Sequence, residues 1–103
     1  MDGQRQIRRT EEFAKWLMNL RDRQGRAKIL ARIDRLEEGN PGKTRNVGAG
    51  IVEMKVDFGP GYRVYYVQRG EALILLLCGG DKSTQSEDIK RAKVLAAQWR
   101  EAE

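Results

Sequence analysis

The chain has 103 residues, enough for one modest hydrophobic core and too few for two. Hydrophobic residues make up 40% and charged residues 34%, a composition that indicates a folded protein and excludes a disordered tail. Twenty Lys and Arg residues against 15 Asp and Glu residues give a net charge of +5, which favours a polyanionic partner. We therefore predict a single domain over residues 1–103.

Apolar runs and cysteine content predict a cytoplasmic protein. The longest apolar run, residues 72–78, is about a third of the roughly 20 residues that a membrane-spanning helix needs, so no membrane contact is expected. The first ten residues hold no apolar stretch behind their basic residues, so we expect no secretory signal. The only cysteine, Cys78, lies in the apolar run and is expected to be an inert thiol in the core.

The N-terminal part of the chain is predicted to form a short strand and two helices. Residues 6–9 favour a strand, and Thr10 is the expected N-cap of a helix with Glu11 and Glu12 at the positive end of its dipole. Apolar residues then recur at helical spacing at Phe13, Trp16, Leu17 and Leu20, and again at Ile29, Leu30, Ile33 and Leu36. Gly25 weakens the pattern, and residues 39–42 end it. A helical hairpin is expected.

From Val52 the apolar period becomes two, which predicts strands. One face carries Val52, Met54, Val56 and Phe58, and the other carries Glu53, Lys55 and Asp57. Residues 59–61 predict a turn, and residues 62–68 a second strand in which Arg63, Tyr65 and Val67 oppose Tyr62, Val64 and Tyr66. After a second turn at residues 69–71, residues 73–78 are apolar throughout, as in a strand flanked on both sides.

The last element is predicted to be a helix. Thr84 and Glu87 match a capping box ahead of an apolar stripe at Ile89, Ala92, Leu95, Ala96 and Trp99. The whole order predicts an α+β fold: a small antiparallel sheet, made of the short N-terminal strand and a three-stranded meander, packed against the N-terminal helical hairpin, with a C-terminal helix. The hairpin is expected to leave the other sheet face, with Glu53, Lys55 and Arg63, partly open.

Most enzyme sites are excluded by composition. The chain has no histidine and one cysteine, which excludes zinc sites and Ser-His triads. Its glycines form no nucleotide-binding fingerprint, so no cofactor is expected. Glu53, Asp57 and Asp81 are scattered carboxylates in a basic protein, so no metal site is expected.

The remaining candidate site consists of Lys55, Arg63 and Tyr65 on the open face and Lys82 after the last strand. These residue types suit RNA cleavage, because RNA supplies its own 2′-hydroxyl nucleophile and the enzyme needs to align it, move protons and neutralise the phosphate. Arg63 offers a bidentate fork for phosphate, and Tyr65 a stacking surface or a proton. Lys55 or Glu53 is the general base, and the sequence does not decide between them. The alternative is that these charges are the solvated side of a half-buried strand.

A second candidate surface is basic. Residues 21–35 contain six basic and two acidic residues, which fits either a solvated helix face or a nucleic-acid contact. The candidate RNA- or ribosome-binding residues are Arg21, Arg23, Arg26, Lys28, Arg32, Arg35, Lys43 and Arg45.

Four segments resemble the RelE/ParE superfamily of toxins, and specifically its HigB-like branch of addiction module killer proteins. They are RRTEEFAKWL (residues 8–17), ILARIDRLEEGNPG (29–42), EMKVDFGPGYRVYYVQRG (53–70) and LLLCGGDKSTQSEDIKRAK (75–93). The resemblance spans residues 7–99.

This resemblance implies the toxin of a type II toxin-antitoxin system, an endoribonuclease that cuts messenger RNA in the ribosomal A site and is silenced by a HigA-like helix-turn-helix antitoxin. It implies a phosphate-binding role for Arg63 and a base or charge-stabilising role for Glu53 and Lys55. Relatives carry histidine or tyrosine near Asp81 and Lys82; here Lys82 is the candidate general acid and Tyr65 the reserve. The alternatives are a ParE-like gyrase inhibitor and a non-catalytic module that binds nucleic acid through residues 21–35.

Overall fold

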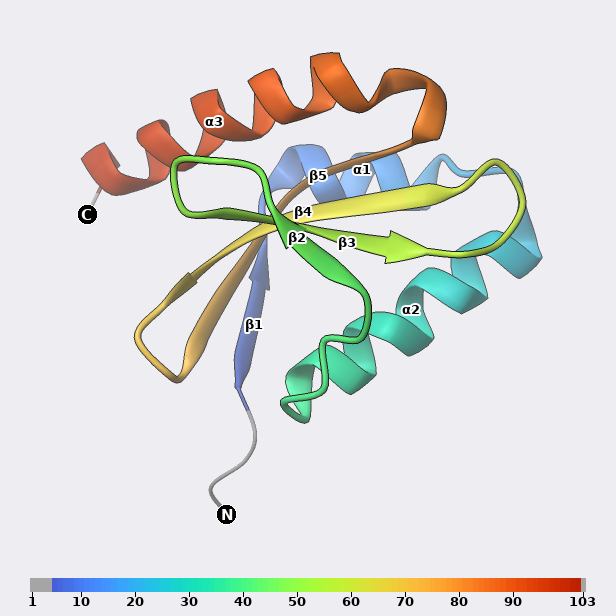
Figure 1. Cartoon of the computed structure of the whole chain (residues 1–103), viewed down its shortest axis with the longest axis horizontal. Helices are drawn as coiled ribbons and strands as arrows, with labels where there is room; N and C mark the ends of the chain where they lie inside the picture. Colours follow the sequence, from blue (N-terminus) through green and yellow to red (C-terminus); the bar gives the residue numbers. More distant parts are fainter. Residues whose placement is uncertain (1–4, 103) are drawn as a thin grey trace.

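The computed structural model describes residues 5–102, with side chains up to residue 100, and Figure 1 shows the arrangement of its elements. The ends of the predicted domain, residues 1–4 and 103, lie outside the described residues. The first four of the ten residues in which no secretory signal was expected are therefore not described. In chain order the elements are β1 (Gln6–Arg9), α1 (Glu11–Met18), α2 (Arg23–Glu37), β2 (Thr44–Asn46), β3 (Ile51–Val56), β4 (Tyr62–Arg69), β5 (Leu73–Asp81), the 3-10 helix η1 (Lys82–Thr84) and α3 (Gln85–Ala102). The predicted α+β class is confirmed.

The strands form one mixed sheet in the order β1-β5-β4-β3-β2. The predicted β3-β4-β5 meander is confirmed, and β5 is flanked on both sides. The prediction of an all-antiparallel sheet is wrong at β1, which pairs parallel with β5. β2 was not predicted, because its three residues are all exposed and show no apolar alternation. It pairs with β3 at the edge, with Arg45 opposite Glu53.

Helices α1 and α2 cover one face of this sheet. Thr10 caps α1 as predicted by accepting a hydrogen bond from the Phe13 amide, and Asp22 caps α2 by accepting one from Gly25. Gly25 lies inside the first turn of α2, where a Cβ atom would strike the ring of Tyr62. The core cluster on this face contains Phe13, Leu17, Ile29, Ile33, Leu36, Met54, Val56, Tyr62, Val64, Tyr66, Ile74 and Leu76.

Helix α3 covers the opposite face, on the far side of the strands from α2 (Figure 1). Its apolar stripe, formed by Ala92, Leu95 and Ala96, is buried against the sheet. The other members of this cluster are Ile51, Tyr65, Val67, Leu75, Leu77 and Cys78. Cys78 is in the core as predicted, and burial raises the pKa of its thiol to about 12.

The position of α3 corrects the prediction that the face carrying Glu53, Lys55 and Arg63 is partly open. Glu53 is fully buried and Arg63 is 7% exposed, while Lys55 is half-buried. The predicted capping box of Thr84 and Glu87 is also wrong, because the chain first makes the turn of η1, capped by Asp81 and Thr84. None of the helices in the described part of the chain is both long and apolar enough to cross a lipid bilayer.

Candidate functional site

Three predicted site residues, Lys55, Arg63 and Lys82, meet where β3, β4 and β5 lie side by side. Lys55 and Arg63 are direct partners across β3 and β4, and Arg63 lies opposite Gly80 on β5. A Cβ atom built on Gly61 would lie 3.3 Å from Nη1 of Arg63 and 3.5 Å from Cβ of Lys82, so both residues flank this turn. Lys82 is exposed. We call Lys55, Arg63 and Lys82 the cation cluster.

The guanidinium of Arg63 is held against the protein rather than projecting into solvent. Its Nη1 donates hydrogen bonds to the carbonyl oxygens of Gly61 (2.9 Å) and Tyr62 (3.3 Å). Its Nε is buried without a hydrogen-bond partner among the described residues and lies 4.0 Å from Oε1 of Glu53. A buried donor left without a partner has a free-energy cost, and Nε of Arg32 is in the same situation.

Glu53 is the centre of a buried polar network. Its carboxylate accepts hydrogen bonds from Arg45 Nε (2.7 Å), the Tyr65 hydroxyl (3.0 Å) and Gln85 Nε2 (2.9 Å). Burial raises the pKa of Glu53, but these hydrogen bonds outweigh it and leave the pKa lowered. A carboxylate that is buried, fully hydrogen-bonded and held ionised is a weak proton acceptor, which argues against Glu53 as the general base.

Tyr65 is fully buried beside Glu53. Burial first, and then the charge and hydrogen bond of Glu53, raise the pKa of its hydroxyl far above the usual range. Its ring packs in the cluster under α3, so it presents no surface on which a base could stack. The geometry assigns Tyr65 to the support of Glu53.

Gln85 and Asp88, both from α3, belong to this region and were missed by sequence analysis. Two glycines near the end of β5 allow close approach: a Cβ atom on Gly80 would strike the carboxylate of Asp88, and one on Gly79 would strike the ring of Trp16. Burial raises the pKa of Asp88, a hydrogen bond from Thr84 opposes this, and the charge of Asp81 raises it further. The Gly79-Gly80 pair was the available signal, because adjacent glycines in a strand mark close approach on both faces.

The predicted RNA- or ribosome-binding residues fall into two groups. Arg21, Arg23 and Arg35 are exposed, and Lys28 is exposed with its amine 5.6 Å from the ring centroid of Phe58. Arg32 is instead half-buried and donates to the carbonyl oxygens of Lys55 and Pro41, tying α2 to the segment that leads into β2. Its hydrogen bonds are made within the protein, so its position fits a structural role.

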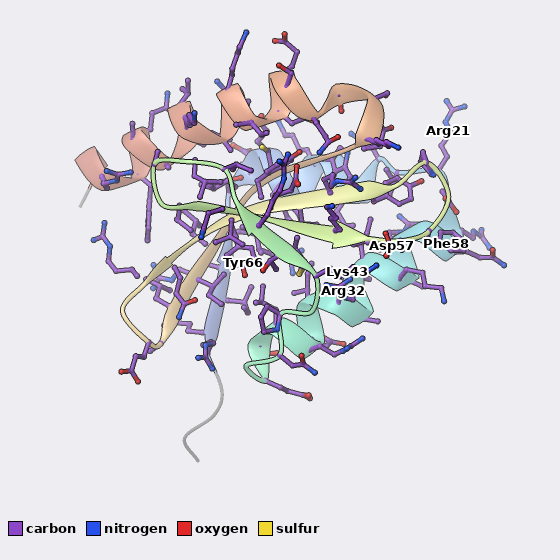
Figure 2. All side chains as sticks on the ribbon, in the orientation of Figure 1. Arg21, Arg32, Lys43, Asp57, Phe58 and Tyr66 are labelled. Atoms are coloured by element: carbon purple, nitrogen blue, oxygen red, sulfur yellow. The ribbon has the colours of Figure 1, made fainter. Side chains whose placement is uncertain are left out.

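Three more of these candidates have partners within the chain. The Arg26 guanidinium donates to the carbonyl oxygen of Met18. Lys43 pairs with Asp57 at 2.9 Å beside the site, where Figure 2 shows the two side chains together. The hydrogen bond from Lys43 lowers the pKa of Asp57. Arg45 contacts Glu53 but keeps 53% of its side chain exposed, so it can still reach a ligand.

Comparisons with known proteins give this arrangement a family. The family described as phage-derived protein Gp49-like matches residues 15–100. An uncharacterized protein of Haemophilus influenzae is 52% identical over 91 residues, which cover 88% of this chain and 92% of that protein. The chain belongs to the Gp49-like family. Gp49-like proteins are a RelE/HigB-type toxin-like family, so the predicted resemblance to these toxins is confirmed at that level, and the HigB-like branch stays a prediction.

Among the described residues of this Gp49-like protein, no three His, Cys, Asp or Glu side chains lie together in a way that could hold a metal ion. The accessible cations of the site are Lys55, Lys82 and the exposed part of Arg45, with Arg63 beneath them; the carboxylates of Asp57, Asp81 and Asp88 lie beside them. An arrangement of this kind binds an anion such as a phosphate.

Proposed function

We propose that this Gp49-like protein is the toxin of a toxin-antitoxin pair and that it cleaves messenger RNA in the ribosomal A site without a metal ion. The family supports the toxin role and the existence of a cognate antitoxin. The observation that carries the cleavage proposal is the cation cluster, in which Lys55, Arg63 and Lys82 converge from three neighbouring strand ends. A HigA-like antitoxin and the ribosome are the proposed partners.

The proposed reaction transfers the phosphoryl group within the RNA strand. The 2′-oxygen forms a bond to phosphorus and loses its proton, while the bond from phosphorus to the 5′-oxygen breaks and that oxygen gains a proton. Lys55 and Lys82, with the charge of Arg63 beneath them, offset the negative charge that grows on the phosphate oxygens. Because Glu53 is occupied, Lys55 is the better-placed proton acceptor of the two candidates.

The proton donor in this proposal is Lys82 or Asp88. Lys82 is exposed at the start of η1, directly after β5. Asp88 contacts Gly80, which is the register partner of Arg63, and its raised pKa favours the protonated form that a general acid needs. Tyr65 is the weaker choice, because it is buried and bonded to Glu53.

Binding without cleavage, as in a ParE-like gyrase inhibitor, is the second candidate function. The burial of Glu53, Arg63 and Tyr65 favours it, since three of the five predicted catalytic groups are withdrawn from solvent. A cationic surface for binding needs no proton acceptor or donor.

The deciding experiment is a brief induction of the protein in cells, followed by mapping of RNA 5′ ends and of gyrase-linked DNA breaks. New RNA ends inside codons of ribosome-bound transcripts are expected. We expect Arg63→Ala to abolish growth arrest while antitoxin binding is retained, and Arg63→Lys, which keeps the charge without the fork, to restore part of it. Arg91→Ala is the matched control on α3. DNA breaks without new RNA ends would replace the nuclease proposal with gyrase inhibition, and unchanged toxicity of Arg63→Ala would remove Arg63 from the mechanism.

A further inference from the structure

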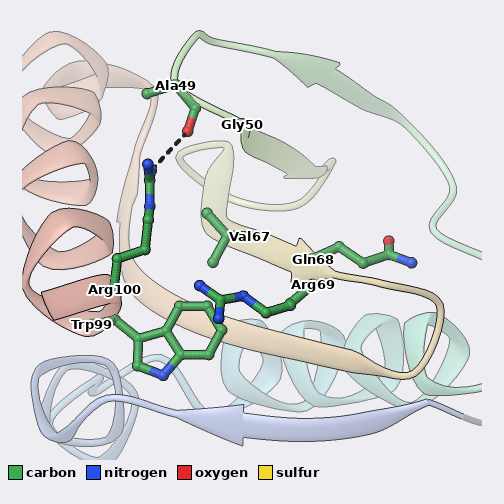
Figure 3. Close-up of a pocket in the computed structure, with 7 residues that line it drawn as sticks. All are labelled: Ala49, Gly50, Val67, Gln68, Arg69, Trp99 and Arg100. Atoms are coloured by element: carbon green, nitrogen blue, oxygen red, sulfur yellow. Dashed lines mark hydrogen bonds between the residues drawn. The ribbon is translucent and has the colours of Figure 1, made fainter. Parts of the chain in front are cut away.

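A second cationic surface lies at the opposite end of β4 from the cation cluster. The Arg69 guanidinium stands 4.7 Å from the ring centroid of Trp99, and Arg100 Nη2 donates a hydrogen bond to the carbonyl oxygen of Ala49 (3.5 Å). Figure 3 shows the two guanidinium groups on either side of a hollow, with Val67 between them. The hollow has a volume of about 240 Å³. Because Arg100 bonds a neutral carbonyl there, that contact leaves its charge uncompensated.

Trp99 also borders a second hollow, of about 420 Å³, between β1 and α3. Arg8 lines it and is the register partner of Leu75, so its side chain is on the α3 face of the sheet. Among the side chains that the structure describes, Arg8 forms no ion pair, and no Asp or Glu lines either hollow. We call Arg8, Arg69, Trp99 and Arg100 the Trp99 patch: three guanidinium groups around one half-exposed indole ring.

The Trp99 patch and the cation cluster lie on the same side of the molecule. Arg63 and Arg69 are both on the α3 face of β4, six residues apart, which at strand spacing is about 20 Å. Helix α3 runs between the two surfaces, from Gln85 at the buried network to Arg100. Lys93 lies in the middle of α3. Its side chain extends towards the loop between β2 and β3, where a Cβ atom built on Gly48 would lie 3.5 Å from its Nζ. Lys93 therefore adds one positive charge between the two surfaces.

We infer that the Trp99 patch is a second binding site for the RNA substrate, which takes a nucleotide distant from the cleaved phosphate. This inference rests on the proposed function, because it takes RNA as the polyanion. A nucleotide needs a flat surface for its base and cations for its phosphates, and bases stack both on aromatic rings and on guanidinium planes. Arg69 and Trp99 provide both planes, and Arg8 and Arg100 supply charge on either side. An acidic peptide would use the charges and leave the indole unused.

The test measures binding of a labelled oligoribonucleotide of about 12 nucleotides, a length typical of single-strand sites, by fluorescence anisotropy. The Arg63→Ala background keeps the strand intact. We expect Arg69→Gln/Arg100→Gln to weaken binding about tenfold and to reduce the slope of log affinity against log salt by about 0.7, since Arg100 is assigned one phosphate contact and each such contact on a single strand contributes about 0.7. The control pair, Lys15→Gln/Lys90→Gln, removes two exposed charges outside the patch, on side chains that are 71% and 73% exposed. Affinity equal to that of the control pair would overturn the inference.

A second comparison separates nucleotide binding from charge alone. A strand of the same length and charge that lacks bases is expected to bind at least about fivefold more weakly than RNA, and Trp99→Leu, which keeps the apolar contact with the core, should abolish the difference. Equal loss for RNA, the base-free strand and a polyglutamate peptide in the double arginine variant would instead indicate a site for an acidic protein segment. If the wild type cleaves RNA and the Arg69→Gln/Arg100→Gln variant binds and cleaves it equally well, the Trp99 patch is not an RNA-binding site and the nuclease proposal stands. If RNA binding depends on the Trp99 patch but no cleavage occurs, the patch is an RNA-binding site and the nuclease proposal fails.

Discussion

On strand β4, Tyr62, Val64 and Tyr66 face the N-terminal helices, whereas Arg63 and Tyr65 face α3. The first face is an apolar core, at whose margin the Tyr62 hydroxyl donates a hydrogen bond to the Asp22 carboxylate. The second face buries a carboxylate and a guanidinium among apolar residues. Buried ionised groups seldom stabilise a fold more than apolar side chains of similar size would. The difference indicates that the first face provides stability and that the second positions charge.

The largest expected effect on stability comes from the apolar face. Phe13 is fully buried at the centre of the cluster formed by α1, α2 and the sheet. Phe13→Ala should lower the free energy of unfolding by about 4 kcal/mol, because it removes a large buried side chain and leaves a cavity. Urea denaturation followed by circular dichroism measures this. Met18→Ala, at a site that is 73% exposed on the same helix, is the control and should change little. If Phe13→Ala lowers the free energy of unfolding less than Glu53→Gln does, the first face is not the one that provides most of the stability.

On the charged face, Glu53→Gln should lower stability at neutral pH by about 2 kcal/mol, because the amide cannot satisfy Arg45, Gln85 and Tyr65 together. The folded-state pKa of Glu53 is lowered, so its contribution is present above its ordinary value of 4.5 and is lost as pH falls through the folded-state pKa.

Denaturation midpoints measured from neutral to acidic pH check this dependence. The wild type should lose stability on acidification faster than Glu53→Gln does, and the two should converge at low pH. Asp57→Asn, which removes an exposed carboxylate of lowered pKa, is the matched control. Parallel curves for wild type and Glu53→Gln would show that the buried network does not hold Glu53 ionised.

Substitutions at the adjacent glycines of β5 test the two faces of the sheet at neighbouring positions. Gly79→Ala drives a methyl group into the ring of Trp16 and should cost about 2 kcal/mol, since the packed indole cannot move away. Gly80→Ala meets the carboxylate of Asp88, the end of a side chain that can rotate, so its stability cost should be smaller. It should nevertheless reduce RNA cleavage more than Gly79→Ala, because it displaces Asp88 beside Arg63. Equal loss of stability and activity in the two variants would contradict this.

The smallest effect is expected at the contact that joins the two layers. Arg91 on α3 makes a bidentate ion pair with Glu12 on α1, 2.7 Å at its shortest. Both side chains are partly exposed, and ion pairs in water contribute little. Arg91→Gln should leave the thermal midpoint unchanged within error. A clear drop in the thermal midpoint of Arg91→Gln, with no similar drop when salt is added to the wild type, would mean that this ion pair fixes α3 on the sheet.

Local sequence patterns determined the elements and their order, except for the edge strand β2 and the turn of η1. Apolar spacing placed the helices and the meander, Thr10 marked the start of α1, and the uniform apolar character of residues 73–78 placed β5 between two strands. The same patterns brought Lys55 and Arg63 together, because antiparallel neighbours joined by a short turn have few possible registers. The apolar period of the sequence is enough to predict strand pairing where the two strands are close in the chain.

Tertiary structure alone decided what lies over the second face. The parallel pairing of β1, the edge strand β2 and the packing of α3 join segments distant in sequence, and a strand's local pattern does not specify such partners. The helix stripe of Ala92, Leu95 and Ala96 had to be buried somewhere, but only the assembled sheet shows that it buries Glu53, Tyr65 and most of Arg63. Residue types can therefore nominate charged groups for chemistry, whereas their solvent access is set by long-range packing.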